Sequence, residues 1–386
     1  MSGVDDALLE RVRAELAAGS GAATPARVAA ALRAQGAVLG DEAVLAVTRS
    51  LSAEITGAGP LDALLRETGV TDVLVNGPDE VYVDRGAGLE RARVRLRDEP
   101  AVRRLAQRLA ATAGRRLDDA VPWVDARLAG GVRLHAVLPP LSPAGTLLSL
   151  RVPARRAFTL DELVRSGSVP APVEPLLRGL VAARLAFLVT GGTGTGKTTV
   201  LSSLLSLVDP RERIVLVEDT GELQPDHPHV VRLQSRPANV EGVGEIAMVH
   251  LVRQALRMRP DRLVVGEVRG AEVVDLLAAM NTGHEGGCGT VHANSAADVP
   301  ARLEALGVAA GLGRDALHSQ VAAALDAVVH LVRDAEGRRR VAEIDLLRPA
   351  ADGQVVAVPA LLCEAGGAVR AGPGYDVLRR RVDGEP

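Results

Sequence analysis

The spacing of apolar positions divides the chain into three regions, and the first is helical. Residues 4 to about 52 carry apolar side chains at helical spacing, as in DALLERVRAELA and DEAVLAVTRSLSAEI. In TPARVAAALRAQG, Thr24 precedes Pro25, an N-cap followed by proline at the first helical position. We therefore expect residues 1–54 to form a helical extension.

Alternating apolar positions begin at Val70 and predict strands. TDVLVNGPDEVYVDR reads as two strands joined by a turn over residues 76–79. An arginine-rich helix, AVRRLAQRLAATAG, comes next, followed by two strand candidates, RLAGGVRLHAVLPP and GTLLSLRVP. This order predicts a compact α+β domain over residues 55–152. Residues 153–175, with three prolines after Ser166, are expected to be a linker.

Residues 176–386 alternate short apolar runs with helical segments. LAFLVT, RIVLVED, RLVVGEV and CGTVHA are separated by helices, which predicts an α/β domain with a parallel sheet covered on both faces. Ligands of such sheets bind at the carboxyl ends of the strands. After Arg302 we expect an Ala/Leu-rich helix, then AAALDAVVHLVRD and RRRVAEIDLLRP as edge strands, and a loose tail.

The loop after the first of these strands carries the strongest chemical signal. In LVTGGTGTGKTTV, four residues occupy the fixed positions of G-x-x-x-x-G-K-[ST], the phosphate loop of nucleoside triphosphatases. Glycines let backbone N–H groups point at phosphate oxygens, the lysine reaches the β- and γ-phosphates, and the threonine hydroxyl ligates Mg²⁺. The expected nucleotide-binding residues are Gly191, Gly192, Thr193, Gly194, Thr195, Gly196, Lys197, Thr198 and Thr199.

Composition strengthens this interpretation and excludes others. Lys197 is the only lysine among 386 residues, so an ordinary glycine-rich turn is a poor alternative. A net charge of −3 and 1% aromatic residues give no reason to expect stable nucleic-acid binding. Two cysteines without a CxxC partner argue against a structural zinc site and favour a reducing cytoplasm. We find no targeting segment, and no apolar stretch of the ~20 residues that a membrane span needs.

Acidic residues end two of the apolar strands. RIVLVE ends in Glu218, with Glu222 one turn on, and RLVVGE ends in Glu267. Hydrolysis of a nucleotide needs carboxylates that hold Mg²⁺ and position the attacking water. We predict that Glu267, together with Thr198, serves the metal and the water. Glu218 is the predicted general base, with Glu222 as a helper, and a solvated loop charge is the alternative for each.

The segment TGHEGGCGTVHAN contributes His284 and His292. Their spacing is not HExxH, so a shared zinc site is a weak hypothesis. Glycines on either side suggest a backbone that passes close to a ligand, and a histidine near the γ-phosphate would sense its presence. The alternative for each histidine is a structural role in a tight loop.

Arginines are too common in this chain for composition to single one out, and surface ion pairs are the default. Arg127, Arg133 and Arg151 lie in the strand-rich part of the first domain. An arginine supplied to a neighbouring subunit's nucleotide would stabilise charge developing on the γ-phosphate. We name these three as candidates for that role.

Taken together, the motifs resemble those of the type II/type IV secretion motor ATPases, and within them the tight-adherence (Tad) pilus assembly ATPases. The resemblance covers about residues 55 to 350, with the motifs in the family's order. It rests on GGTGTGKTT, IVLVEDTGEL, RMRPDRLVVGEVRGAEVVDLLAAMNTGHEGGCGTVHAN, DVLVNGPDEVYVDRGAGLE and DARLAGGVRLHAVLPPL. The tetra-cysteine zinc element of many pilus-extension ATPases is absent from this sequence.

The resemblance implies an α/β fold, in which a RecA-like P-loop NTPase domain over residues 176–386 follows the smaller N-terminal α+β domain and the helical extension. It implies a homohexamer that uses ATP and Mg²⁺ beneath inner-membrane platform proteins, cytoplasmic and peripherally associated with the membrane. The family's acidic box then falls on Glu218 and Glu222, its Walker B acid on Glu267, and its histidine box on His284 and His292.

Two further interpretations remain beside a motor that powers pilus assembly or protein secretion. The same RecA-like core serves DNA translocases and conjugal transfer ATPases, although the near-neutral charge and missing aromatics disfavour them here. A nucleotide-gated scaffold without turnover is the other, and the presence of Lys197, Glu218 and Glu267 disfavours it.

Overall fold

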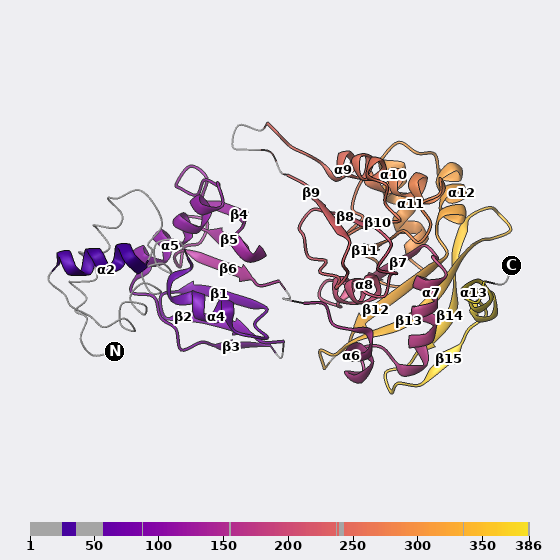
Figure 1. The fold of residues 1–386 in the computed structure, drawn as a ribbon, viewed down its shortest axis with the longest axis horizontal. Coiled ribbons are helices and arrows are strands. Elements are labelled where there is room, and N and C mark those ends of the chain that lie inside the picture. The colour runs from indigo at the N-terminus through magenta and orange to yellow at the C-terminus, as the bar shows by residue number, and fades with distance from the viewer. Residues whose placement is uncertain are drawn as a thin grey trace. The chain divides into compact units, whose positions relative to one another are not determined.

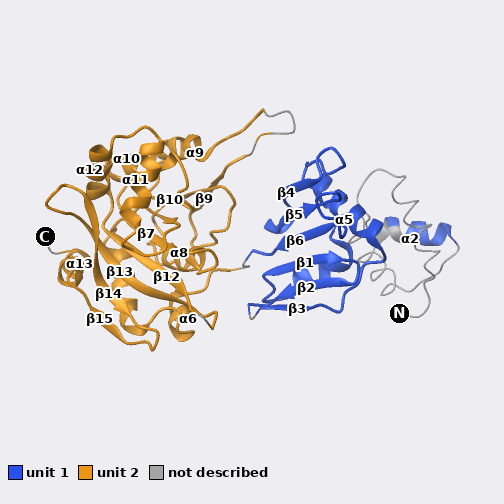
Figure 2. Ribbon diagram, turned by 180° about the vertical axis from the view of Figure 1, so that it is seen from behind, with its two compact units in different colours: residues 1–153 blue, residues 154–386 orange. Residues whose placement is uncertain are grey.

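A computed structural model describes residues 25–35, 57–86, 88–153, 156–236, 238, 243–334 and 336–384 (Figure 1). The chain divides into two compact units, residues 1–153 and 154–386, and we describe each by itself (Figure 2). In unit 1, helix α2 (Pro25–Ala34) confirms the helix that begins at the Thr24-Pro25 signal. The helices predicted over residues 6–17 and 41–55 lie outside the described residues.

Unit 1 is built on an antiparallel sheet whose described strands lie in the order β3-β2-β1-β6-β5-β4. The predicted hairpin is confirmed, because β1 pairs with β2 up to Gly77 and Glu80. Two short strands, β3 and β4, had not been expected. The strands are β1 (Asp72–Gly77), β2 (Glu80–Asp84), β3 (Leu89–Arg91), β4 (Trp123–Arg127), β5 (Arg133–Val137) and β6 (Leu147–Arg151).

One face of this sheet is covered by helices α4 (Asp62–Arg66) and α5 (Glu99–Thr112). The arginine-rich helix is thus confirmed as α5, which begins where the Asp98 carboxylate accepts a hydrogen bond from the Ala101 N–H. Val102, Leu105 and Leu109 recur at helical spacing and are buried against the strands, whereas Arg104 is exposed. The opposite face of the sheet mixes polar and charged side chains with apolar ones such as Leu74 and the exposed Trp123.

Unit 2 is a mixed sheet with helices on both faces, as the alternating pattern predicts (Figure 1). The described strands lie in the order β15-β14-β13-β12-β7-β11-β10-β8-β9, parallel from β12 to β9 and antiparallel from β12 to β15. They are β7 (Phe187–Gly191), β8 (Ile214–Glu218), β9 (Val230–Gln234), β10 (Arg262–Val265), β11 (Cys288–Val291), β12 (Ala327–Arg333), β13 (Arg339–Pro349), β14 (Val355–Cys363) and β15 (Val369–Ala371).

Two apolar layers hold the helices of unit 2 against its sheet. One face packs against α6 (Leu160–Arg165), α7 (Glu174–Ala182), α8 (Lys197–Leu205) and α13 (Tyr375–Val382). The other face packs against α9 (Met248–Ala255), α10 (Glu272–Met280), α11 (Val299–Ala309) and α12 (Arg314–Ala324). Successive residues of β7 alternate between the two layers, because strand side chains point to opposite faces. None of the described helices is long and apolar enough to cross a bilayer.

The structure corrects three expectations about unit 2. Residues 153–175 are not simply a linker, because α6 lies within them and buries Leu160 and Leu163 in the core. The two predicted edge strands, β12 and β13, are not at an edge: β12 pairs with β7 and β13, and β13 pairs with β12 and β14. The tail forms β14, β15 and α13 instead of a loose end. For the linker and the tail, tertiary burial outweighs the local prolines and charges that suggested irregular structure.

Strand β13 carries a buried carboxyl group, Asp345, that is only 2% exposed. Its Oδ1 has no hydrogen-bond partner among the described residues. Burial, and then the neighbouring charge of Glu343, raises the pKa of Asp345 to about 7. An unfolded aspartate ionises near its ordinary pKa of 3.8, so the folded chain keeps a proton that the unfolded chain has lost between these two values.

We predict that Asp345→Asn stabilises unit 2 in a pH-dependent way. The contribution of Asp345 to stability is fully present below its unfolded pKa and is lost as the pH rises through about 7. The free energy of unfolding of the variant, relative to wild type, should therefore be higher at pH 8 than at pH 4.5 by on the order of 1–3 kcal/mol. Denaturant titrations at the two pH values measure this, with the exposed Asp315→Asn as control. An equal effect at both pH values would contradict the prediction.

Candidate functional site

The parallel register of unit 2 brings the predicted motifs to one edge of the sheet. Strand β7 pairs with β11 and β12, and β11 pairs with β10. Their carboxyl ends lead into the phosphate loop after Gly191, into Glu267 after β10, and into His292 after β11. Because parallel strands end on the same side, these three segments form one site.

The phosphate loop has the backbone that its glycines predict. Gly191, Gly194 and Gly196 have φ values of 143°, 74° and 95°, a region that favours glycine. A Cβ on Gly191 would lie 2.4 Å from the carbonyl oxygen of Leu331 on β12, so this strand end has no room for a side chain. Helix α8 begins at Lys197 without a side-chain cap, which leaves its first N–H groups directed toward the loop.

The Lys197 ammonium group lies inside the loop. Its Nζ donates to the carbonyl oxygens of Gly191 at 2.9 Å and Gly192 at 2.8 Å. His292 Nε2 is 3.4 Å from the same atom. Burial lowers the pKa of Lys197, while the charges of Glu267 and Glu222 act in the opposite direction. The ammonium group is therefore partly desolvated. A bound phosphate would draw it away from the two carbonyl oxygens.

Glu267 faces His292 across the end of the sheet. The Oε1 of Glu267 is 2.7 Å from His292 Nε2, and its Oε2 pairs with Arg269. Burial, followed by the charge of Lys197, lowers the pKa of His292, so the ring is neutral at physiological pH. Lys197, Glu267 and His292, predicted from three separate segments, are thus brought together.

A magnesium ion fits the groups at this edge. Glu267 Oε1 is a buried carboxylate oxygen that makes no hydrogen bond of good geometry within the described residues. Thr198 stands one residue after Lys197 in the first turn of α8. Among the described residues no three His, Cys, Asp or Glu side chains are grouped closely enough to hold a metal by themselves. Hard oxygen ligands of this kind, completed by phosphate and water, suit Mg²⁺.

Glu218 has a different environment from the one expected of a general base. It is buried, and its Oε1 accepts hydrogen bonds from the backbone N–H groups of Glu222 and Leu223, both at 2.9 Å. Burial raises the pKa of Glu218 above its usual range. Its carboxylate therefore holds the turn that carries Glu222, whose charge acts directly on Lys197. Within this acidic box, Glu222 is the better placed for chemistry.

Arg269 was not singled out from the sequence. It follows Glu267 by two residues and pairs with it, and its charge also acts on Lys197 and His292. The backbone N–H groups of Arg269 and Gly270 donate to Glu272 Oε1 at 2.6 and 2.8 Å, which fixes this turn at the start of α10. The sequence did not single out Arg269 because arginines are common in this chain. Only the pairing with Glu267 distinguishes Arg269 from the other arginines.

His284 does not join His292. It precedes β11, at the amino end of the strand, and both its backbone N–H and its Nδ1 lie within hydrogen-bonding distance of the Ala279 carbonyl oxygen. The expectation that all motifs lie at the carboxyl ends of the strands is therefore wrong for His284. These contacts favour the alternative for His284, a structural role in a tight loop.

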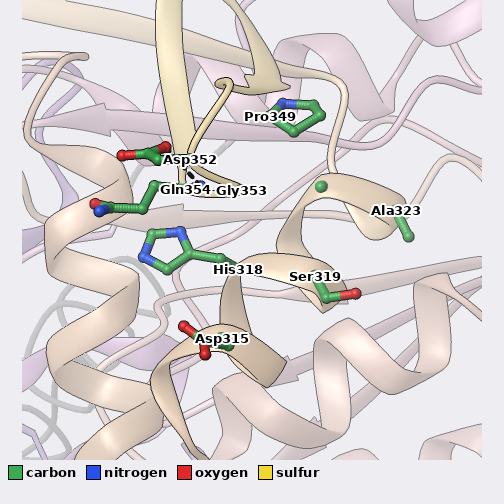
Figure 3. A pocket seen from close by; sticks show the side chains of 9 residues that line it. Asp315, His318, Ser319, Ala323, Pro349, Asp352, Gly353 and Gln354 are labelled. Atoms are coloured by element: carbon green, nitrogen blue, oxygen red, sulfur yellow. Dashed lines mark hydrogen bonds between the residues drawn. The ribbon is translucent and has the colours of Figure 1, made fainter.

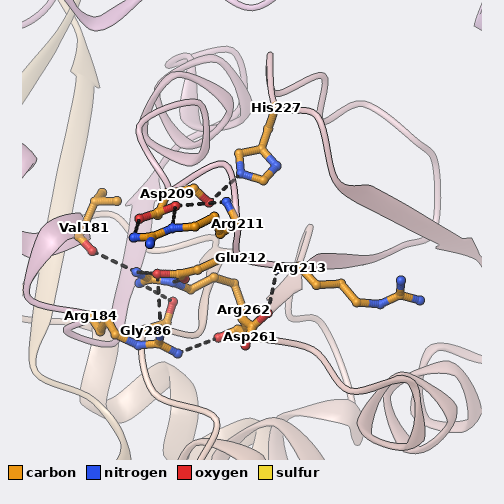
Figure 4. A network of polar contacts seen from close by, with 10 residues as sticks. All are labelled: Val181, Arg184, Asp209, Arg211, Glu212, Arg213, His227, Asp261, Arg262 and Gly286. Carbon is orange, nitrogen blue, oxygen red and sulfur yellow. Dashed lines mark hydrogen bonds and ion pairs between the residues drawn. The ribbon is translucent and has the colours of Figure 1, made fainter.

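Gly286, two residues after His284, is explained by a buried arginine at this opposite edge (Figure 4). Arg262 is 3% exposed, donates to Glu212 Oε2 at 2.5 Å and to the Val181 carbonyl oxygen at 3.0 Å. A Cβ on Gly286 would lie only 2.0 Å from Arg262 Nη1. Gly286 thus makes room for a side chain of the protein, whereas a ligand had been the expected reason.

The three arginine candidates form a row in unit 1. Arg127 on β4 lies opposite Arg133 on β5, which lies opposite Arg151 on β6. Arg133 and Arg151 are exposed, and Arg127 is half-buried. Like charges at directly opposed positions of an antiparallel sheet repel each other. On the other side of Arg151, Asp72 of β1 lies in register with it and offsets part of that repulsion.

The chain is similar to known proteins along most of its length. A family model described as "Type II/IV secretion system protein" matches residues 54–368. A Mycobacterium tuberculosis (strain H37Rv) protein named for conjugal transfer is 58% identical over 351 residues, covering 89% of this chain and 99% of the relative. The type IV secretion system protein PtlH of Bordetella pertussis is 34% identical over 310 residues, covering 72% and 91%.

The fold also matches a solved structure. The pilus retraction motor PilT with bound ADP has a TM-score of 0.52 at 19% identity, over 84% of this chain and 85% of that one. This likeness supports the RecA-like fold with a preceding N-terminal domain. The family match spans the phosphate loop, Glu267 and His292. This chain belongs to the type II/IV secretion ATPase family.

Proposed function

We propose that this chain is a motor ATPase that hydrolyses ATP, as a homohexamer, to power pilus assembly or protein secretion at the cytoplasmic membrane. The observation that carries the proposal is the position of Lys197, the only lysine of the chain, on the phosphate-loop carbonyls of Gly191 and Gly192. Glu267 and His292 complete the arrangement. Membership of the secretion ATPase family supports the assignment.

Nucleotide binding follows from the groups that the loop offers. The backbone N–H groups of residues 192–198 would donate hydrogen bonds to the phosphate oxygens at the positive end of α8. Lys197 would then exchange its two carbonyl partners for the β- and γ-phosphates. Thr198 and Glu267 would hold Mg²⁺. When bound, the ion neutralises negative charge on the phosphate oxygens.

The acidic residues divide the remaining work. Glu267, beside His292, would orient the attacking water. Glu222, on the turn that Glu218 holds, would accept a proton from this water. The neutral His292 ring lies 3.4 Å from Lys197 Nζ. It would lose this neighbour when the ammonium group moves to a phosphate. Arg269 keeps the Glu267 carboxylate paired before nucleotide arrives.

The assembly is proposed at a coarser level. The row of Arg127, Arg133 and Arg151 would stabilise charge on a nucleotide's phosphates in the assembled ring, because three guanidinium groups stand at opposed positions on neighbouring strands. We propose inner-membrane platform proteins as partners, a peripheral cytoplasmic location, and the Tad pilus branch of the family. The segments quoted above from the sequence support these assignments.

Conjugal transfer is a second candidate, because the Mycobacterium tuberculosis relative and TrbB of Rhizobium radiobacter are named for it. In that setting the same hydrolysis would move a DNA or protein substrate. The chain's net charge of −3 and its 1% aromatic content do not favour direct contact with DNA.

We predict that Glu267→Gln retains ATP binding but lowers kcat by about 100-fold, because the amide removes a charge needed for Mg²⁺ and water. Steady-state phosphate release and fluorescent-nucleotide titration measure the two quantities. Glu285→Gln, the same change at an exposed position near His284, is the control and should behave as wild type. Unchanged turnover in Glu267→Gln would instead favour the nucleotide-gated scaffold.

The acidic box yields a second comparison. Glu222→Gln should lower kcat about tenfold more than Glu218→Gln, because a glutamine at position 218 still accepts the N–H groups of residues 222 and 223. Parallel kcat measurements on the two variants decide it. A larger loss in Glu218→Gln would restore Glu218 as the general base.

Single-stranded DNA should not stimulate ATP hydrolysis by this chain. Motors that translocate DNA bind it through phosphate contacts, so their stimulation falls steeply with salt. We expect the same kcat with and without DNA at about 50 and 200 mM salt. Strong, salt-sensitive stimulation would support the DNA translocase and contradict the secretion motor.

A further inference from the structure

A buried histidine outside the predicted motifs lies directly behind the phosphate loop. His330 on β12 is 3% exposed and pairs in register with Thr190, the residue before Gly191. The Thr190 hydroxyl is 2.8 Å from His330 Nδ1, and Thr190 is itself fully buried. One imidazole ring is therefore tied to the strand end from which the phosphate loop departs.

The same ring reaches the segment that carries His292. We define the His292 loop as residues 292–298, between β11 and α11. The backbone of Asn294 in this loop lies near the His330 ring and raises the pKa of His330 against the effect of burial. On the neighbouring strand, Glu343 lies opposite His330, and its Oε1 accepts the Ala296 N–H at 3.2 Å. Two adjacent strands thus grip the His292 loop by its main chain.

Core stability alone does not account for this pair. Burying the His330 ring and partly burying Glu343 costs desolvation free energy, and apolar residues of similar size would fill the space at lower cost. Only hydrogen-bonding side chains can fix the backbone of residues 294 and 296 in direction as well as distance. Burial lowers the pKa of His330, which keeps the ring neutral for its contact with Thr190.

We propose that His330 and Glu343 are positioning residues for ATP hydrolysis. By tying the His292 loop to the strand that ends in the phosphate loop, they fix His292 beside Glu267 and Lys197. Neither residue touches the nucleotide. This inference rests on the proposed ATPase function, but the grip on the loop is a property of the fold that can be measured without turnover.

The kinetic test is a double-mutant cycle between His330 and His292. His330→Leu should lower kcat about tenfold and change the KM for ATP by less than about twofold, because the phosphate-loop contacts remain. In the His292→Ala background the same change should lower kcat by less than about twofold, since its effect acts through His292. His330→Gln, which keeps a hydrogen-bonding side chain, should recover most of the activity.

His318→Leu is the matched control for removing a buried histidine. His318 is 4% exposed, contacts Glu304 and accepts the Val355 N–H, beside a surface pocket that contains none of the predicted site residues (Figure 3). It should lower stability without lowering kcat. A similar fall in kcat for His318→Leu, or equal losses from His330→Leu in both backgrounds, would overturn the positioning role.

Hydrogen exchange tests the proposal without any measurement of ATPase activity. In the full-length chain, His330→Leu and Glu343→Leu should each speed amide exchange in peptides covering residues 292–298 by about tenfold or more. Peptides of unit 1 should be unchanged. Unaltered protection of residues 292–298 in both variants would refute the grip. A wild-type chain without ATPase activity would refute the proposed function while leaving the exchange result to decide the grip.

Discussion

A single ammonium group, Lys197 Nζ, is the contact around which the site is arranged. It closes the phosphate loop on the carbonyl oxygens of Gly191 and Gly192, and the charges of Glu267 and Glu222 hold it there. This position exists because β12, β7, β11 and β10 run parallel and end together. A shift of one strand would separate the lysine from its acidic partners.

The segments that follow β8, β10 and β11 at this edge are each held by a carboxylate that accepts backbone N–H groups. Glu218 holds the turn of residue 222, Glu272 holds that of residue 269, and Glu343 holds the His292 loop. Backbone bonds of this kind limit how far a loop can move. The side chains nearest the phosphates are therefore positioned by a second set of residues that never reaches them.

The sequence was sufficient to predict the parts of the site that a local motif defines. The phosphate loop, the acid after β10 and the parallel sheet all follow from spacing and strand-helix alternation. What it could not supply depends on long-range pairing. His330 and Glu343 lie far along the chain from Thr190, and only the pairing of β12 with β7 and β13 brings them together. Because VVHLVRD reads locally as an edge strand, its central position was missed.

The residues that were misjudged share a cause. His284 and the glycines around it looked like a ligand loop, but Arg262, which begins a strand elsewhere, needs the space beside Gly286. Glu218 ends a strand as predicted, but the pattern did not indicate that it is buried and accepts two backbone N–H groups. In both cases the local pattern was real, and the partner that explains it came from a distant segment.

The central claim is that Lys197 faces the terminal phosphates of bound ATP. An acyl-phosphate derivative of ATP, which transfers its acyl group to a lysine beside those phosphates, tests it directly by peptide mass spectrometry. Because the chain has one lysine, side-chain amine labelling should appear only at Lys197 and should disappear with excess ATP. Absence of labelling at Lys197, or labelling that excess ATP does not prevent, would contradict the account.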